Sequence, residues 1–303
     1  MKLLTANLSG DDLLADVNKQ ITEKIIASLE RGEIPWKKPW VAGFPRNMLT
    51  GRPYNGINVF LLWNSRFTSN WWGTEKQIQK LHGRLKAGAE PHFVFFAGWK
   101  SRLLANNESG ERINSTFGFT KLYRVFNADQ CEGLKMPHPE GKSEDYARAA
   151  AIVNGYQQCK VLTTQDMAAY HPGHDVIYMP PQNCFTSLEE YYVTLFHEMA
   201  HSTGHPDRLN RPGFAKAING RPGCSKEELV AEMAACFLCA EAAINSDAGF
   251  ANRVAYIDHW LSVLRKDDKI LYRAASQAQK AVNYILGRNK AVQGSANAEK
   301  TRD

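Results

Sequence analysis

Residues 187–207 read SLEEYYVTLFHEMAHSTGHPD, and they carry the most informative pattern in the chain. Ser187 and Glu190 have the spacing of a capping box, which predicts that a helix begins here and runs to about residue 202. Within this helix His197 and His201 are four positions apart and share one face. Glu198 stands beside the first histidine and completes the pattern HExxH. The stretch therefore predicts a helix with two imidazoles aimed at one point.

The pattern HExxH is typical of a catalytic zinc site. Two neutral imidazoles leave a net positive charge on a bound Zn²⁺, which can then act as a Lewis acid. The alternative is a chance match, because the pattern is short. A strand predicted at 175–180 precedes the helix, as in zinc peptidases where an edge strand holds the peptide substrate. We expect one Zn²⁺ per chain, with His197 and His201 as ligands and Glu198 as the catalytic general base.

A catalytic zinc site needs a third protein ligand and one open position. The segment EELVAE places Glu228 and Glu232 on one face of a predicted helix over 225–243. Glu228 is the expected ligand, with Glu232 bonding a ligand histidine from the outer shell. If Glu228 instead closes a capping box with Ser225, Glu232 becomes the ligand. Asp207 is a third candidate, because HEMAHSTGHPD resembles HExxHxxGxxH with Asp in the last place.

The N-terminal part of the chain has a different composition. Residues 1–130 contain 18 Lys and Arg against 11 Asp and Glu, a charge of +7, whereas the whole chain of 303 residues carries +6. Six of the 7 tryptophans lie within the first 100 residues, and all 6 cysteines lie beyond residue 130. Two domains with different functions explain this asymmetry better than one uniform fold does.

Cationic side chains mixed with aromatic ones are what a nucleic-acid-binding surface requires, because cations contact phosphates and rings stack on bases. The alternative is that the tryptophans belong to the core, as we expect for Trp63 on the apolar face of a helix at 56–66. The residues predicted to contact nucleic acid are Trp36, Lys37, Lys38, Trp40, Arg46, Arg52, Tyr54, Trp71, Trp72 and Lys76.

Periodicity and turn residues predict an α+β fold of two domains. We expect a mixed α/β N-terminal domain at 1–135, a linker at 136–145, a C-terminal domain at 146–287 and a disordered tail at 288–303. The predicted helices span 11–31, 56–66, 74–87, 145–157, 187–202, 225–243, 248–265 and 271–286. The predicted strands span 92–99, 117–126, 160–163 and 175–180.

Several separated motifs, in one order, resemble a known family. HEMAHSTGHPDRLNR followed by EELVAEMAACFLCAE is similar to the zincin-like metallopeptidase domain of ArdC-type antirestriction proteins, which also occurs near the N-terminus of TraC-type plasmid primases. GEIPWKKPW, YNGINVFLLW and LYRVFNADQCEGL resemble the single-stranded DNA-binding N-terminal domain of that family. The resemblance extends over roughly residues 10–287.

The resemblance implies a protein that binds single-stranded DNA and protects incoming plasmid DNA from host restriction during conjugation. It also implies a zinc metallopeptidase site made by His197, His201 and a glutamate of EELVAE, with a host restriction-related protein as the peptidase substrate. A non-enzymatic protector that binds single-stranded DNA, with a structural metal, is the alternative. Metal-dependent hydrolysis of nucleic acid is disfavoured, because the sequence lacks a carboxylate-rich two-metal pattern.

The sequence also argues against a membrane protein. No apolar run approaches the roughly 20 residues of a membrane-spanning helix. The N-terminus MKLLTANLSGDDLLADV has a short apolar stretch followed at once by acidic residues, which is unlike a signal peptide. We therefore expect a cytoplasmic protein of the bacterial host, with cysteines that are free thiols.

Overall fold

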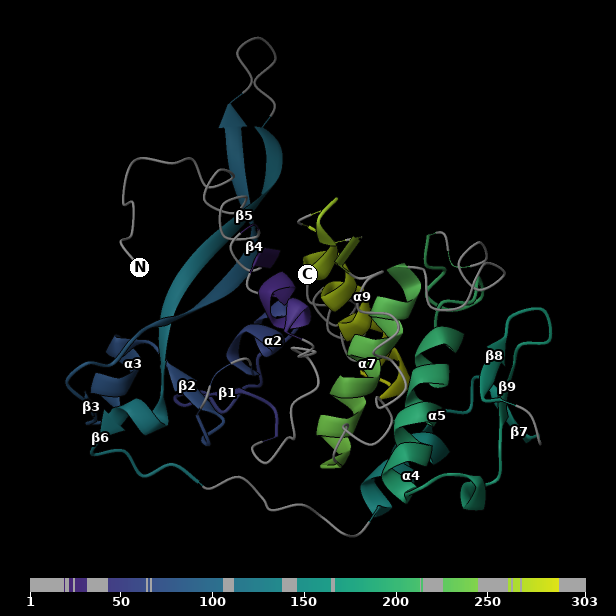
Figure 1. Cartoon of the computed structure of the whole chain (residues 1–303). Helices are drawn as coiled ribbons and strands as arrows, with labels where there is room; N and C mark the ends of the chain where they lie inside the picture. The colour runs from purple at the N-terminus through teal and green to yellow at the C-terminus, as the bar shows by residue number, and fades with distance from the viewer. Residues whose placement is uncertain are drawn as a thin grey trace, which may run out of the picture.

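The computed structural model has an α+β architecture with two parts, as the sequence predicts (Figure 1). It describes residues 19, 22–23, 25–31, 43–63, 65, 67–105, 112–137, 146–164, 167–212, 214, 226–244, 261–262, 264–267 and 269–288. The predicted linker residues 138–145 and the predicted tail from 289 onward lie outside them, as does almost all of the predicted helix 248–265. No helix in the described part combines the length and apolar character needed to cross a lipid bilayer.

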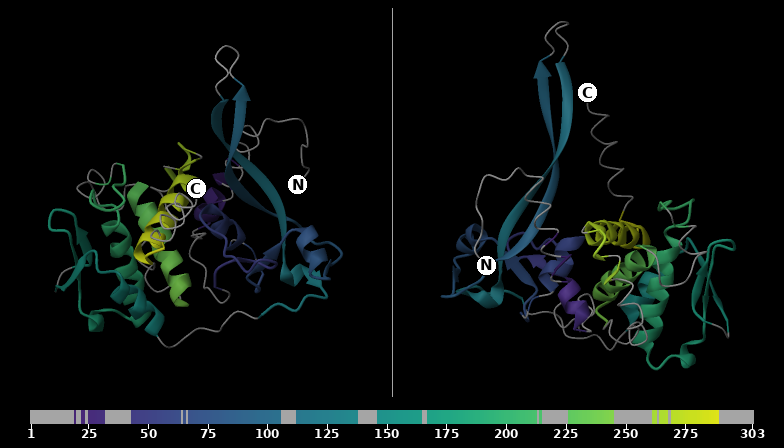
Figure 2. Two further views of the ribbon diagram at one scale, coloured as in Figure 1. Left: turned by 180° about the vertical axis from the view of Figure 1, so that it is seen from behind. Right: turned by 45° about the horizontal axis from the view of Figure 1, so that its top comes forward.

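The N-terminal part is built around a long antiparallel hairpin. Its strands β4 (His92–Ala105) and β5 (Arg112–Asn127) pair from His92 opposite Val125 to Ala105 opposite Arg112. The hairpin projects well beyond the helices in every view (Figures 1 and 2). Both strands are longer than predicted. Their backbone pairing continues through residues whose sequence shows no clean alternation of apolar and polar types.

Two short strands extend the sheet in the order β1-β2-β5-β4. They are β1 (Arg46–Asn47) and β2 (Trp71–Gly73), both placed in loops by the sequence analysis. Helix α2 (Ile57–Trp63) packs on β4 and is one turn shorter than predicted. Elements of two or three residues are stabilised by pairing with distant partners, and sequence periodicity does not detect them.

The helix predicted at 74–87 is wrong in its second half. Helix α3 (Glu75–Lys80) begins at a capping box of Thr74 and Gln77, as expected, but ends after six residues. His82 then adopts a positive φ of 60°, which lies outside the region of a right-handed α-helix and therefore ends the helix. The chain continues as β3 (Arg84–Leu85), which pairs with β6 (Cys131–Glu132).

In its described residues, the C-terminal part contains four helices of nine or more residues and a small sheet. The helices are α4 (Ala147–Gly155), α5 (Leu188–Ser202), α7 (Lys226–Ala242) and α9 (Ile270–Ile285), close to the predicted bounds. Helix α7 is buried along nearly its whole length between α5 and α9 (Figure 1). The sheet has the order β7-β9-β8, from β7 (Lys160–Thr163), β8 (Ala169–His171) and β9 (Val176–Met179).

The two parts share one hydrophobic core. Phe237 of α7 is fully buried, and its ring stacks on Phe60 of α2 with centroids 4.9 Å apart. Phe44 and Trp63 complete the cluster, at 5.8 and 5.9 Å from the Phe237 ring. Trp63 is only 7% exposed, which confirms its predicted place in the core. The N-terminal part is therefore packed against the helix that carries the candidate metal ligand, rather than tethered beside it.

Candidate metal centre

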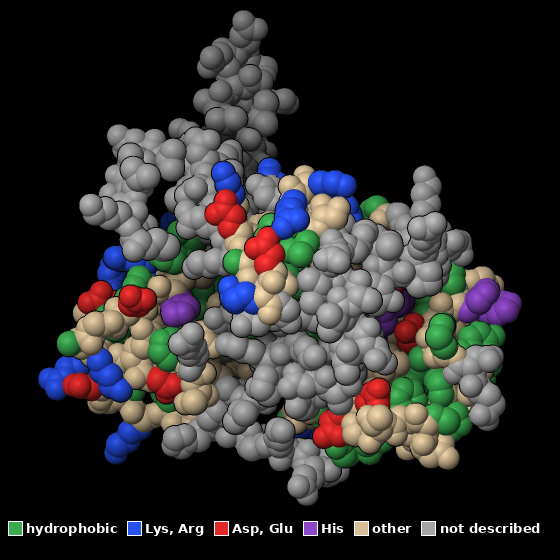
Figure 3. Space-filling view, in the orientation of Figure 1, with side chains coloured by type: hydrophobic (Ala, Val, Ile, Leu, Met, Phe, Trp, Pro, Cys, Tyr) green, Lys and Arg blue, Asp and Glu red, His purple; other side chains and the backbone are tan. Residues whose placement is uncertain are grey.

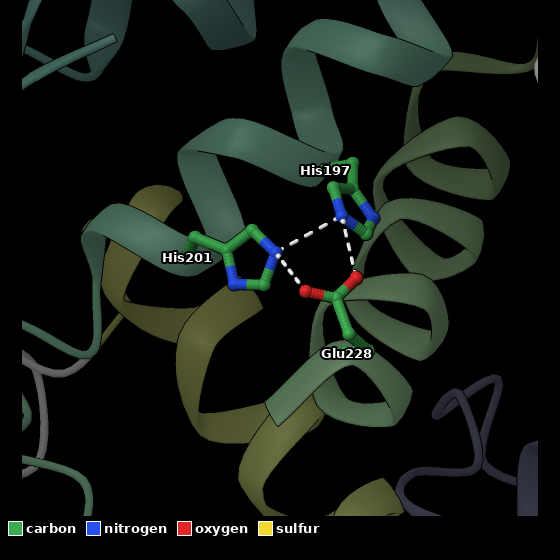
Figure 4. A group of neighbouring side chains, drawn as sticks. All are labelled: His197, His201 and Glu228. Atoms are coloured by element: carbon green, nitrogen blue, oxygen red, sulfur yellow. Dashed lines mark hydrogen bonds and ion pairs between the residues drawn. The ribbon is translucent and has the colours of Figure 1, made fainter. Parts of the chain in front are cut away.

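Two helices bring three ligand-type side chains to one point (Figure 4). Helix α5 contributes His197 and His201, each about 5% exposed, and α7 contributes Glu228. One nitrogen from each histidine and a carboxylate oxygen all lie within 4.8 Å of one another. Among the described residues, this is the one group of three or more His, Cys, Asp or Glu side chains with that geometry.

The separations between the donor atoms fit a single ion. The Nε2 atoms of the histidines lie 3.0 Å apart, and Glu228 oxygens lie 3.4 Å from Nε2 of His197 and 3.3 Å from Nε2 of His201. Two donors that each bind one tetrahedral ion at about 2.1 Å are roughly 3.4 Å apart. Two imidazole nitrogens and one carboxylate are also the donor set of catalytic zinc sites. The residues present therefore fit a divalent metal such as zinc.

The other two ligand candidates lie elsewhere. Asp207 has an 87% exposed side chain, and its carboxylate is placed 3.6 Å from Nδ1 of His205, outside the cluster. Glu232 is buried one helical turn beyond Glu228, and the structure does not include it in the cluster. Ser225, the expected helix cap, lies outside the described residues.

A glutamate that the sequence analysis overlooked occupies the outer-shell place expected for Glu232. The Oε1 atom of Glu227 lies 3.4 Å from Nδ1 of His201, on the side of the ring away from Glu228. The buried guanidinium of Arg211 donates to Glu227 from Nε at 2.9 Å and also from its Nη2. A carboxylate on the outer nitrogen orients a ligand histidine and sets its tautomer. Its position next to Glu228 is the sequence signal that could have pointed to it.

Charge is balanced inside this cluster. Burial alone lowers the pKa of His201, but hydrogen bonds to Glu227 and Glu228, with nearby negative charges, raise it to about 10. Burial raises the pKa of Glu228, whereas both histidines hold it far below its ordinary value. Glu228 therefore stays ionised across the physiological range, which is the form that ligates a cation.

Replacing Glu227 with glutamine is expected to weaken metal binding by about 10- to 100-fold. The amide keeps the size of the side chain but loses the charge that fixes His201, and it leaves Arg211 without its anionic partner. Competition against a chromophoric chelator measures the affinity. The exchange Glu132→Gln, at an exposed glutamate of strand β6, is the matched control and should leave the affinity unchanged. Equal affinities for Glu227→Gln and the control would contradict the orienting role.

The proposed base, Glu198, is held by the edge strand of the small sheet. The backbone N–H of Tyr170, in β8, donates to Oε2 of Glu198 at 2.7 Å, and Glu198 is 8% exposed. The strand predicted at 175–180 was expected to be the edge strand, and this is wrong. It corresponds to β9, which is the central strand, whereas β8 is an edge strand and contacts α5. A three-residue strand gives too little pattern to be recognised in the sequence.

The buried side chain of Arg208 connects β8 and the residue before β9 to the end of α5 through hydrogen bonds. Arg208 donates to both carboxylate oxygens of Asp175, to the Tyr170 hydroxyl at 3.1 Å and to the carbonyl of Ser202 at 2.6 Å. The hydrogen bonds from Arg208 are the main cause of the lowered pKa of Asp175. These contacts fix the distance between Tyr170 and the helix that carries Glu198.

This ion pair should make stability depend on acid pH. Because the pKa of Asp175 is lower in the folded chain than in the unfolded chain, its stabilising effect is present above the unfolded value and is lost as pH falls. Asp175→Asn should therefore be less stable than the wild type at pH 7, and the difference should shrink below about pH 4. Urea unfolding at pH 7 and below about pH 4 measures the free energy of unfolding of both proteins. A difference that grows on acidification would contradict the assignment.

Two protein families and a solved structure match this two-part architecture. A family described as the N-terminal domain of anti-restriction factor ArdC matches residues 15–126, and a zincin-like metallopeptidase family matches residues 147–277. The crystal structure of the metal-free antirestriction protein ArdC from plasmid R388 superposes with a TM-score of 0.74 at 34% identity, covering 89% of this chain and 97% of that one. This chain belongs to the ArdC family. The Mn(II)-bound structure of the same ArdC matches with a TM-score of 0.68 at 32% identity.

Relatives of the ArdC family include longer proteins. A DNA primase TraC of Escherichia coli is 31% identical over an alignment of 300 positions, which covers 90% of this chain and 28% of the primase. An uncharacterized protein y4eC of Sinorhizobium fredii is 28% identical over 289 residues and is matched over 91% of its length. The chain thus spans about a quarter of the TraC primase, and the ArdC module occurs both as most of a protein and as part of one.

The ArdC N-terminal domain does not present all the aromatic residues predicted to contact nucleic acid. Trp72 is 2% exposed and packs against Phe67 and His92, so its predicted stacking on bases is wrong. Trp71 is half-buried and donates from Nε1 to the Pro137 carbonyl at 2.8 Å. Tyr54 is half-buried as well, and burial raises its pKa. Trp36, Lys37, Lys38 and Trp40 lie outside the described residues.

The predicted cations of this domain are better placed. Arg46, Arg52 and Lys76 are exposed. Around α3 and β3, on the left of Figure 3, further exposed Lys and Arg side chains lie beside scattered acidic ones. Arg84 is already paired with Glu132 at 2.7 Å, so the surface there is mixed rather than uniformly basic. Among the described candidates, the cations are thus exposed, whereas the ring of Trp72 is buried and those of Tyr54 and Trp71 are half-buried.

Proposed function

We propose that this protein binds single-stranded DNA through its N-terminal domain, carries a zinc-dependent peptidase site in its C-terminal domain, and protects incoming plasmid DNA from host restriction during conjugation. The observation that carries the proposal is the convergence of His197, His201 and Glu228 in a chain of the ArdC family. Its relative from plasmid R388 is an antirestriction protein with a Mn(II)-bound form. A host protein of the restriction machinery is the substrate class that we propose for the peptidase.

The arrangement of side chains supports peptide hydrolysis. His197, His201 and Glu228 would hold the metal, and zinc would supply Lewis acidity when bound. Glu227, backed by Arg211, orients His201. The amide of Tyr170 orients Glu198, which would accept a proton at its carboxylate and return it to the leaving amine. Burial of the histidines keeps bulk water from competing for their nitrogens.

The exchange Glu198→Gln tests catalysis. Glutamine can still accept the hydrogen bond from Tyr170 and leaves the three ligands in place, but it cannot act as a base. Plasmid transfer into a restricting host measures protection, and metal analysis of the purified variant checks the site. We expect a variant that retains its metal and loses protection by at least about 100-fold, the scale of a missing general base. Full protection by Glu198→Gln would overturn the peptidase proposal.

One observation favours a non-enzymatic protector instead. The hydrogen bond from Tyr170 gives Glu198 a structural role that requires no catalysis, and the metal could likewise hold α5 against α7. In that case single-stranded DNA binding alone would protect the incoming strand. Wild-type protection by Glu198→Gln, with loss of protection in variants that no longer bind DNA, is the outcome that would select this function.

A further inference from the structure

Two aromatic rings are exposed on the long hairpin. Phe96 of β4 is 54% exposed and Tyr123 of β5 is 40% exposed. Their rings meet edge to face, with centroids 6.4 Å apart and an interplanar angle of 83°. They are the two exposed large aromatic side chains among the residues whose side chains the structure describes. Large aromatic side chains are usually well buried, so two exposed rings in contact with each other are an unusual feature of a protein surface.

The strand register places a cation on the same face. Phe96 lies directly opposite Lys121, and Tyr123 lies opposite Val94, so these four positions alternate onto one side of the hairpin. Lys121 is exposed. Nearer the base of the hairpin the same face is closed, because Val94 and Val125 pack into a small core with Leu62 and Trp72. The exposed pair therefore begins where the hairpin leaves the body of the domain.

The hairpin is held against helix α2 next to these two rings. Asn58 of α2 binds both backbone groups of Phe95, donating to its carbonyl at 2.7 Å and accepting from its N–H at 2.7 Å. These groups lie on the outer edge of β4, which is an edge strand of the sheet that the described residues form. Phe95 itself is buried in the main core, so the neighbouring Phe96 ring is held pointing outward.

We propose that Phe96 and Tyr123 form a stacking platform for the bases of single-stranded DNA, with Lys121 beside it for the phosphates. This inference rests on the proposed DNA-binding function and assigns it a surface. Phe96 is 54% exposed and Tyr123 is 40% exposed, so the pair presents ring surface to solvent on which bases can stack. Bases stack on such rings whatever their sequence, and a lysine contributes a salt-dependent contact to the backbone.

The size and charge of the surface favour a nucleic acid over a protein. Within the described side chains, the two rings supply far less apolar area than the roughly 800 Å² per partner of a stable protein interface. Leu49 is the other exposed large hydrophobic residue among the described N-terminal residues, and it lies in the turn after β1 rather than on the hairpin. The positive charge of residues 1–130 also matches a polyanion.

The test measures binding of the full chain to an oligothymidylate of about 16 nucleotides and to an abasic oligonucleotide with the same number of phosphates. We expect the double variant F96A/Y123A to bind the oligothymidylate about 5- to 100-fold more weakly. Its binding to the abasic strand should match that of the wild type. Lys121→Ala should instead weaken binding to both strands and reduce the salt slope by about 0.7.

Controls separate this inference from the proposed function. Leu49→Ala removes an exposed apolar side chain elsewhere in the domain and should bind like the wild type. The double variant F96L/Y123L keeps apolar bulk and β-structure but lacks ring faces, so it should also lose affinity for the oligothymidylate if the fold is kept. A wild type that does not bind single-stranded DNA overturns the proposed function. A wild type that binds it, together with ring variants that bind equally well, overturns only the platform.

Discussion

Glu228→Ala is expected to lower the affinity for Zn²⁺ by more than about 100-fold, the upper limit for losing an outer-shell partner. Both carboxylate oxygens of Glu228 face histidine nitrogens, at 3.3 and 3.4 Å, so the variant retains two imidazoles and loses the anionic donor. Two neutral ligands also leave the buried positive charge of the ion uncompensated. A titration against a chromophoric chelator, with metal analysis after dialysis, measures the loss.

Two other carboxylates provide the comparison for this experiment. Asp207→Ala removes an exposed side chain that lies outside the cluster and should leave the affinity within a few-fold of the wild type. Glu232→Gln preserves the volume of a side chain that is 1% exposed and should retain most of the affinity. A larger loss for either variant than for Glu228→Ala would move the third ligand to that residue.

Phe237→Ala is expected to destabilise the whole chain by about 3–5 kcal/mol. Phe237 is fully buried, and its ring is in contact with three aromatic rings of the N-terminal part. Alanine leaves a cavity at the junction of the two domains, where rigid rings on both sides prevent collapse. The contacts between the domains should weaken most. We expect thermal unfolding to be one transition in the wild type, because the domains share a core, and to separate into two in the variant.

A smaller replacement at the same position tests this cause. Phe237→Leu retains most of the apolar volume and should cost clearly less than alanine. Met167→Ala, at a residue that is 83% exposed, should leave stability within about 0.5 kcal/mol. If Phe237→Ala costs less than about 1 kcal/mol, or if the variant still unfolds in a single transition, the shared core does not join the domains as the structure indicates.

These two residues differ in how far the sequence identified them. Glu228 could be named because its helix, its spacing to Glu232 and the preceding HExxH are local patterns. Phe237 gave no such signal, since it lies in a helix that is apolar on nearly every side. An evenly apolar helix predicts burial without telling which neighbours cover it. Its partners Phe44 and Phe60 are almost 200 positions away in the chain.

The proposed nucleic-acid surface shows even more clearly that residue type does not tell which side chains are buried. Composition pointed to the N-terminal domain and to cations such as Arg46 and Arg52, which are exposed, but it also selected Trp72, which is buried. Tryptophan is large and apolar, so its type alone does not distinguish a stacking surface from a core. Phe96 belongs to the apolar run 92–99 of a predicted strand, in which no residue pattern distinguishes an exposed ring from a buried one. The exposure of that ring depends on where the hairpin leaves the domain.

The sequence by itself determined the helix of His197 and His201, because a spacing of four residues fixes a helix face through backbone geometry alone. It also determined the α+β architecture and the family. Only the tertiary structure decided that Glu227 and Arg211 support His201, that Tyr170 holds Glu198, and that Phe237 joins the two domains. Each of these contacts connects segments whose separation in the chain carries no periodic signal. Such contacts arise when packed elements meet, so they follow from how the elements are assembled in three dimensions.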